Sequence, residues 1–143
     1  MNVKHLDHLN MTVRNLDETE DWYKRVFGFE LVESGLRGDL KWGILKSGDA
    51  MLCVYEYPDL QHPEKAASRD MPHTINHFGL RITDRDKWQE TVKRERLKVG
   101  YGGEVRYPTS SSWYVIDPTG YEIEVALWDQ DVVTFRSPMS VAS

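Results

Sequence analysis

The chain has 143 residues, which suits one ordinary domain, and 40% of them are hydrophobic, enough for a packed core. The formal charge of −5 argues against nucleic acid as a partner, because phosphate binding needs a basic surface. Cys53 is the only cysteine, and no stretch approaches the roughly 18 apolar residues of a transmembrane helix. We therefore expect a cytoplasmic protein with no disulfide and no membrane partner.

The first half of the chain begins with a predicted strand followed by a helix. The strand covers His5 to Val13. Asn15, with Glu18 three residues later, is typical of a helix start, and the apolar residues from Leu16 to Phe27 have helical spacing. Gly28 then predicts the helix end.

The second half opens in the same way. A strand is predicted from His77 to Ile82, with Thr83 or Asp84 as the helix cap. Trp88 and Val92 begin the apolar stripe of a helix that ends before Gly100. His8 precedes Asn15 by the same seven residues that separate His77 from Asp84, which indicates an internal repeat.

The ends of the two halves also match. Residues 42–53 superpose on residues 113–124 at a constant offset of 71, and each stretch reads as strand, Gly-containing turn and strand. The chain is therefore predicted to be α+β, with paired βαβββ modules that form an eight-stranded open cup. The expected divisions of this single domain (1–143) are module one at about 1–58, a connecting loop at 58–73, module two at about 74–128 and a tail at 129–143.

Strand alternation assigns side chains to the two faces of each sheet. The faces expected to cover the helices are apolar and carry Leu9, Met11, Val13, Phe78, Leu80, Ile82, Ile123, Val125 and Leu127. The opposite faces carry polar groups that would point into the cup, namely His8, Asn10, Thr12, His77, Arg81, Glu122 and Glu124.

Two imidazoles and a carboxylate on a concave face suit one divalent metal ion, with Fe(II), Mn(II), Zn(II) and Ni(II) as candidates. His8, His77 and Glu124 are the proposed ligands, and Glu122 is a rival because it shares a face with Glu124. Cys53 stands at the position that Glu124 occupies in the other half. It would serve either as a fourth ligand or as a small buried thiol.

Four stretches of sequence resemble the vicinal oxygen chelate superfamily, which includes glyoxalase I, fosfomycin-resistance proteins, extradiol dioxygenases, methylmalonyl-CoA epimerase and bleomycin-resistance proteins. They are His8-Leu-Asn-Met-Thr-Val13, Trp22-Tyr-Lys-Arg-Val-Phe-Gly-Phe29, Asn76-His-Phe-Gly-Leu80 and Trp113-Tyr-Val-Ile-Asp-Pro-Thr-Gly-Tyr-Glu-Ile-Glu124. The resemblance implies that Glu124 rather than Glu122 binds the metal. It also implies a homodimer and a small-molecule substrate with adjacent oxygens.

The departures from that pattern bear on the reaction. Glyoxalase I and the epimerase carry Glu or Gln at the place of Cys53, which puts isomerase chemistry in doubt. Tyr114 stands where extradiol dioxygenases have an active-site tyrosine, ten residues before the ligand Glu, although their acid–base histidines have no match near Ala50 or Val105. In fosfomycin-resistance proteins a basic residue follows the ligand Glu, whereas Val132 and Val133 stand there here.

An extradiol-dioxygenase-like reaction is therefore the first expectation. Glyoxalase-like lyase or isomerase chemistry, or fosfomycin-type thiol transfer, comes next. Tyr114 would be the catalytic donor, with its pKa lowered by the cation, or else a core aromatic. Asn10, Arg81 and Cys53 would bind substrate, and Arg81 has an internal salt bridge as its alternative role. A metal-free protein that binds a planar ligand at a dimer groove, between aromatic residues such as Trp42, Trp113 and Tyr55, is the other class of function.

Overall fold

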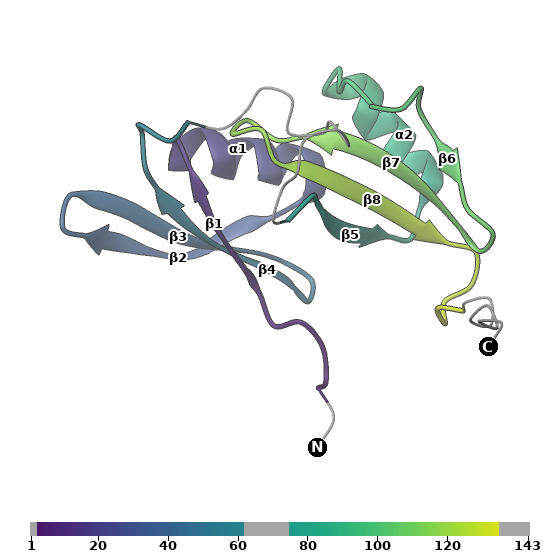
Figure 1. Cartoon of the computed structure of the whole chain (residues 1–143), viewed down its shortest axis with the longest axis horizontal. Coiled ribbons are helices and arrows are strands. Elements are labelled where there is room, and N and C mark those ends of the chain that lie inside the picture. The colour runs from purple at the N-terminus through teal and green to yellow at the C-terminus, as the bar shows by residue number, and fades with distance from the viewer. Residues whose placement is uncertain (1–2, 62–74, 135–143) are drawn as a thin grey trace, which may run out of the picture.

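Two copies of one βαβββ unit make up the computed structural model, which describes residues 3–61 and 75–134 (Figure 1). The elements of module one are β1 (Leu9–Val13), α1 (Leu16–Phe27), β2 (Glu30–Arg37), β3 (Leu40–Ser47) and β4 (Ala50–Glu56). Those of module two are β5 (Phe78–Ile82), α2 (Arg85–Arg94), β6 (Val105–Arg106), β7 (Ser110–Ile116) and β8 (Glu122–Trp128). The predicted α+β class and module order are confirmed.

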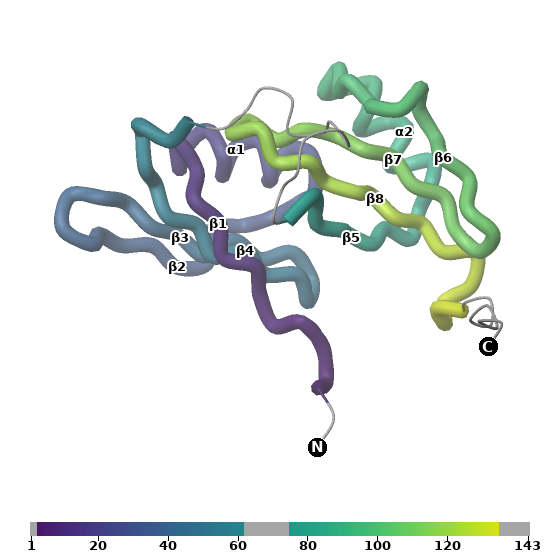
Figure 2. The backbone as a smooth tube through the Cα atoms, in the orientation of Figure 1, coloured from purple at the N-terminus to yellow at the C-terminus, as the bar shows by residue number. Residues whose placement is uncertain are grey.

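Each module is a four-stranded sheet with its helix on one face. The strand orders are β1-β4-β3-β2 and β5-β8-β7-β6, so the first and last strands of each module pair in parallel. The two sheets remain separate and do not close into a barrel (Figure 2). In the described part of the chain, the helices cover one side of the sheets and no helix covers the other side.

Both helices begin as the sequence predicts. The Asn15 side chain accepts a hydrogen bond from the Glu18 N–H at 2.8 Å, and Gly28 ends α1 at φ 70°. Of the two possible caps of α2, the structure selects Asp84, whose side chain accepts from the Lys87 N–H at 3.1 Å. The apolar faces also match the prediction, because Met11, Val13, Ile123 and Val125 are all buried in the core.

The two modules share one hydrophobic core and meet through their helix sides. Phe27 of α1 stacks on Trp88 of α2 at 5.7 Å, and Arg25 of α1 pairs with Glu95 at the end of α2. The buried Tyr23 hydroxyl donates to Asp117 Oδ2 at 2.9 Å. The first two contacts join α1 to α2, and the third joins α1 to the turn between β7 and β8.

Two details of the prediction are wrong. The first strand begins at Leu9 rather than His5. The offset of 71 relates β4 to β8 but does not relate β3 to β7. Cys53 pairs with Ile44, whereas its counterpart Glu124 pairs with Tyr114, one residue before the position that the offset predicts. The connection between β3 and β4 is Gly48-Asp49, whereas β7 and β8 are joined by the longer segment from Asp117 to Tyr121. The difference shifts the strand pairing by one residue, and a one-residue shift turns every side chain to the other face.

Parts of the predicted loop and tail lie outside the described residues, namely 62–74 and 135–143. His62 and His73, which the sequence places in the connecting loop either near the site or on the surface, fall in the first of these segments. The described residues contain no helix long and apolar enough to cross a membrane.

Candidate metal centre

The strand pairing places the predicted ligands at equivalent points of the two modules. His8 and His77 each lie one residue before the first strand of their module. Two residues later, Asn10 pairs with Cys53 and Gly79 pairs with Glu124. Cys53 and Glu124 are therefore true counterparts, as the repeat predicts.

Module two brings His77 and Glu124 together. His77 Nε2 lies 3.0 Å from Glu124 Oε2, and Ser112 Oγ donates to Glu124 Oε1 at 2.6 Å. The rival carboxylate of Glu122 is on the other side of the imidazole, 3.5 Å from Nδ1, and its side chain is only 5% exposed. The Glu124 carboxylate thus has one oxygen held by a hydroxyl and one oxygen beside Nε2.

Tyr114 lies at the centre of the same group. Its side chain is buried, its hydroxyl is 2.8 Å from that of Tyr107, and the His77 ring meets it edge-on at 5.8 Å. Burial raises the pKa of the Tyr114 phenol well above its usual value, and the hydrogen bond with Tyr107 and the charge of Glu124 act in the same direction. In the chain itself the Tyr114 phenol is therefore held in its protonated form. A nearby cation would act in the opposite direction, because it would lower the pKa of the phenol.

Module one contributes an open cavity instead of a compact network. His8 is 45% exposed, and its Nδ1 lies 2.7 Å from Asp7 Oδ2. A cavity of about 450 Å³ is lined by His8, Asn10, Leu36, Arg37, Trp42, Gly43, Ile44, Cys53, Val54 and Tyr55. Burial raises the pKa of the Cys53 thiol, with Asp7 adding to the effect, so the neutral thiol is favoured.

The donor set fits a divalent ion in its chemistry, but its members are divided between the modules. His77 Nε2 donates a hydrogen bond to Glu124 Oε2 at 3.0 Å. Two ligands at about 2.1 Å from one ion and at right angles to each other would also lie about 3.0 Å apart. His8 lines a different cavity from His77. Within residues 3–61 and 75–134, no three His, Cys, Asp or Glu side chains are grouped so that they could hold a metal ion.

Two other predicted residues are engaged elsewhere. The Arg81 guanidinium donates to the backbone oxygens of Gln130 at 3.2 Å and Asp131 at 2.6 Å. Trp113 is buried on the helix side beside Trp88, whereas Trp42 lines the cavity with His8. Trp42 and Trp113 therefore cannot form the two walls of one ligand groove in this chain.

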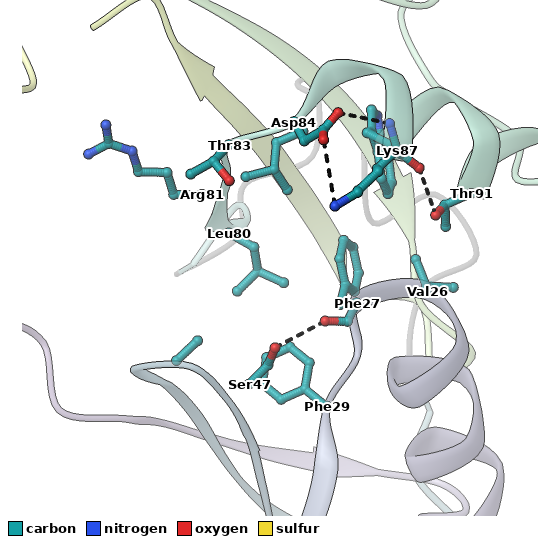
Figure 3. A pocket seen from close by; sticks show the side chains of 13 residues that line it. Val26, Phe27, Phe29, Ser47, Leu80, Arg81, Thr83, Asp84, Lys87 and Thr91 are labelled. Atoms are coloured by element: carbon teal, nitrogen blue, oxygen red, sulfur yellow. Dashed lines mark hydrogen bonds and ion pairs between the residues drawn. The ribbon is translucent and has the colours of Figure 1, made fainter. Parts of the chain in front are cut away.

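A second cleft, of about 320 Å³, lies where the modules meet on the helix side (Figure 3). Its apolar lining includes Phe27, Phe29 and Leu80, and Ser47 Oγ donates to the Phe27 carbonyl at 3.1 Å. Arg81 points away from the cleft in this view. None of the three predicted metal ligands lines it, so the cleft is separate from the candidate centre.

Residues 5–125 match the family model described as Glyoxalase/Bleomycin resistance protein/Dioxygenase superfamily. The chain belongs to this superfamily. The lactoylglutathione lyase of Agrobacterium tumefaciens is a similar solved structure, with 24% identity, a TM-score of 0.63, and coverage of 89% of this chain and 96% of that chain. A glyoxalase family protein of Enterococcus faecalis gives 15% identity, a TM-score of 0.71, and coverage of 86% and 97%.

A mutant fosfomycin resistance protein, FosX of Listeria monocytogenes, is also similar in fold. It has 19% identity, a TM-score of 0.68, and coverage of 89% of this chain and 94% of that chain. That structure contains Mn(II) and 1S,2S-dihydroxypropylphosphonic acid. Identities this low support the shared fold of these superfamily relatives and do not transfer a reaction.

Several neighbours of the site were not predicted from the sequence. Ser112 shares the Glu124 side of the sheet, which the alternation of β7 back from Tyr114 could have indicated. Asp7 is adjacent to His8 in the chain and was a visible signal. The position of Tyr101, whose hydroxyl donates to Glu122 Oε2 at 2.9 Å, had no such signal because it lies on an irregular segment.

Proposed function

We propose that this chain is a divalent-metal-dependent enzyme that acts on a small substrate with adjacent oxygens. The proposed ligands are His8, His77 and Glu124. The observation that carries the proposal is the 3.0 Å approach of His77 Nε2 to Glu124 Oε2, with His8 at the equivalent point of the other module. Imidazole and carboxylate donors suit Fe(II), Mn(II), Zn(II) and Ni(II).

We further propose that the three ligands meet across a homodimer. His8 and His77 line separate cavities in one chain, and the modules touch through α1 and α2. A two-fold axis that places module one of one copy against module two of the other would create two identical sites. The segment before β1 supports such an interface, since Val3 is 88% exposed and Leu6 is 81% exposed.

When bound, the ion acts as a Lewis acid on the adjacent oxygens of the substrate. Tyr114 is the proposed hydrogen-bond donor to one of these oxygens, because burial keeps its phenol protonated. Asn10 and Cys53 line the cavity beside His8 and would bind the substrate without exchanging a proton. Arg81 remains a predicted substrate contact, and it would first have to leave the Gln130 and Asp131 carbonyls.

The residue at position 53 favours one reaction class over the others. An isomerase of the glyoxalase type needs a base there, and the Cys53 thiol has a raised pKa because of burial. We therefore place oxygenation of a substrate with adjacent hydroxyls first. Isomerisation and thiol transfer follow as alternatives, and oxygen uptake with catechol after anaerobic loading with Fe(II) separates oxygenation from both.

Metal analysis of the protein purified without a chelator tests the proposal. We expect about one divalent ion per chain in the wild type, and at least ~100-fold weaker binding in His8→Ala, His77→Ala and Glu124→Gln, because each removes a ligand. His5→Ala is the matched control, since His5 is also exposed near the N-terminus. A wild-type protein that binds no divalent ion would contradict the enzyme proposal.

If the wild type binds no divalent ion, the alternative of a metal-free binding protein is favoured. Trp42 and Tyr55 line the cavity beside His8 and provide aromatic walls for a planar ligand. In that case titration with a planar aromatic compound should quench tryptophan fluorescence in the wild type and not in Trp42→Leu. Trp113 takes no part, because it is buried against α2.

A further inference from the structure

A cavity of about 370 Å³ lies between the two modules, and its lining has an acidic side chain but no Lys or Arg. Residues 9–12 of β1 form one wall, and residues 75–78, Tyr121 and Glu122 of module two form the other. Most of the remaining lining is apolar or carries uncharged polar groups. A cavity of this size suits a small molecule, and its acidic lining suits a cation.

Glu122 is the acidic residue of this cavity, and it is buried without a basic partner. Its side chain is 5% exposed, and Tyr101 donates a hydrogen bond to Oε2 at 2.9 Å. Within residues 3–61 and 75–134, no Lys or Arg pairs with Glu122 or with Glu124. Even a doubly protonated His77 would balance only one of these two carboxylates. A buried carboxylate without a balancing charge is costly, so the pair favours a cation taken from solution.

The hydrogen bonds around His77 leave two acceptor atoms next to each other. Because His77 Nε2 donates to Glu124 Oε2 at 3.0 Å, a neutral imidazole has its proton on Nε2 and a lone pair on Nδ1. That Nδ1 lies 3.5 Å from Glu122 Oε1, and neither atom makes a hydrogen bond to another described residue.

Glu122 Oε1 is also open to the cavity. In the described part of the chain, Trp88 Nε1 is the fully buried side-chain polar atom that lacks a hydrogen bond, so Glu122 Oε1 is not sealed from solvent. His77 lines the same cavity and its side chain is 35% exposed. Two neighbouring acceptors beside a cavity suit a ligand group with at least two N–H donors.

We propose that this cavity binds the protonated amino group of a small organic molecule, with Glu122 Oε1 and His77 Nδ1 as the acceptors. A primary ammonium has three N–H donors, so it can donate to both atoms and balance the carboxylate at the same time. The apolar lining, which includes Leu9, Ile75 and Phe78, suits the carbon part of the molecule. The inference goes beyond the proposed function, and no metal ion takes part in it.

Calorimetric titration of the full chain with benzylamine at neutral pH, with EDTA present, tests the proposal. Benzylamine carries a primary ammonium on a small apolar body. Benzyltrimethylammonium has the same charge without N–H donors, and benzyl alcohol has no charge. We expect saturable binding of about one benzylamine per chain and at least ~10-fold weaker binding of the other two compounds. Equal binding of benzyltrimethylammonium would overturn the assignment of the two acceptors.

Variants of the lining connect the binding to this cavity. Glu122→Gln removes the charge with little change of shape and should weaken benzylamine binding by at least ~10-fold. Glu95→Gln is the matched control, because the Glu95 side chain is 12% exposed and pairs with Arg25 and Arg94 at the end of α2. We expect this control to bind benzylamine as the wild type does.

A second variant tests the same cavity if Glu122→Gln does not fold. Ile75 lines the cavity and is 68% exposed, so its substitution should leave the fold intact. Ile75→Lys places a like charge in the lining and should weaken benzylamine binding, whereas Ile75→Gln should do so much less.

Nuclear magnetic resonance gives the position of the bound compound. We expect Overhauser contacts between benzylamine and the Phe78 ring, and a shift of the His77 Nδ1 resonance during the titration. A wild type that shows no saturable benzylamine binding would overturn the inference, as would binding that is unchanged in both Glu122→Gln and Ile75→Lys. Neither result affects the proposed metal site, which metal analysis tests separately.

Discussion

The two modules have the same strand order and the same helix caps, yet they present different chemistry on their uncovered faces. Module two gathers His77, Glu124 and Tyr114 with their hydrogen-bonding neighbours. Module one offers His8 and an open cavity with aromatic walls. The same fold therefore carries a hydrogen-bonded side-chain network in one module and an open cavity in the other.

The source of the difference is the connection between the last two strands. In module one, Ile44 lies opposite Cys53, and in module two, Tyr114 lies opposite Glu124. The shift of one residue puts the Tyr114 phenol opposite the Glu124 carboxylate and turns the preceding Trp113 into the core. The difference in turn length thus determines which residue of β7 lies opposite Glu124.

The largest expected effect is a difference in stability between variants of Trp42 and Trp113, which occupy equivalent positions in the sequence repeat. Trp113→Ala removes a buried indole beside Trp88 and should lower the free energy of unfolding by about 3–5 kcal/mol. Trp42→Ala, on the cavity side, should cost only about 1 kcal/mol. Urea denaturation of both variants measures the difference. Equal losses would contradict the register shift.

The turns that follow β3 and β7 provide the next test. Asp117 Oδ1 accepts from the N–H groups of Thr119, Gly120 and Tyr121 at 2.8–2.9 Å, and Oδ2 accepts from Tyr23. Asp117→Ala leaves these buried and partly buried donors without their acceptor and should cost about 3 kcal/mol. Asp49→Ala, in the exposed turn of module one, should change the unfolding free energy by less than about 0.5 kcal/mol. A mild Asp117 variant would mean that the turn does not link the modules.

The smallest effect concerns the feature that the modules share. Asn15 and Asp84 each accept one hydrogen bond from the backbone at the start of their helix, at 2.8 Å and 3.1 Å. Alanine at either position should cost about 1 kcal/mol, as loss of a helix cap usually does. Thermal unfolding of the two variants should therefore show similar shifts. A large difference between them would indicate that one helix contributes to stability far more than the other.

Local signals in the sequence predicted the caps, the module order and the core faces, because these depend on spacing along one element. The exact pairing of β7 with β8 was not predicted, since turn length changes register without changing the hydrophobic pattern. The contact of Glu122 with Tyr101 depends on an irregular segment and has no pattern to find. The placement of His8 and His77 in separate cavities depends on how the modules pack, and the repeat contains no information about that.

In the proposed homodimer, one metal site draws its ligands from two copies of the chain. His8→Ala and His77→Ala each destroy every site in their own homodimers. When the two variants are mixed at equal amounts and allowed to exchange subunits, half of the dimers contain both, and each mixed dimer has one intact site. Metal analysis should then recover about one ion per four chains. If the mixture binds no more metal than the separate variants after verified exchange, the ligands belong to a single chain and the shared site is wrong.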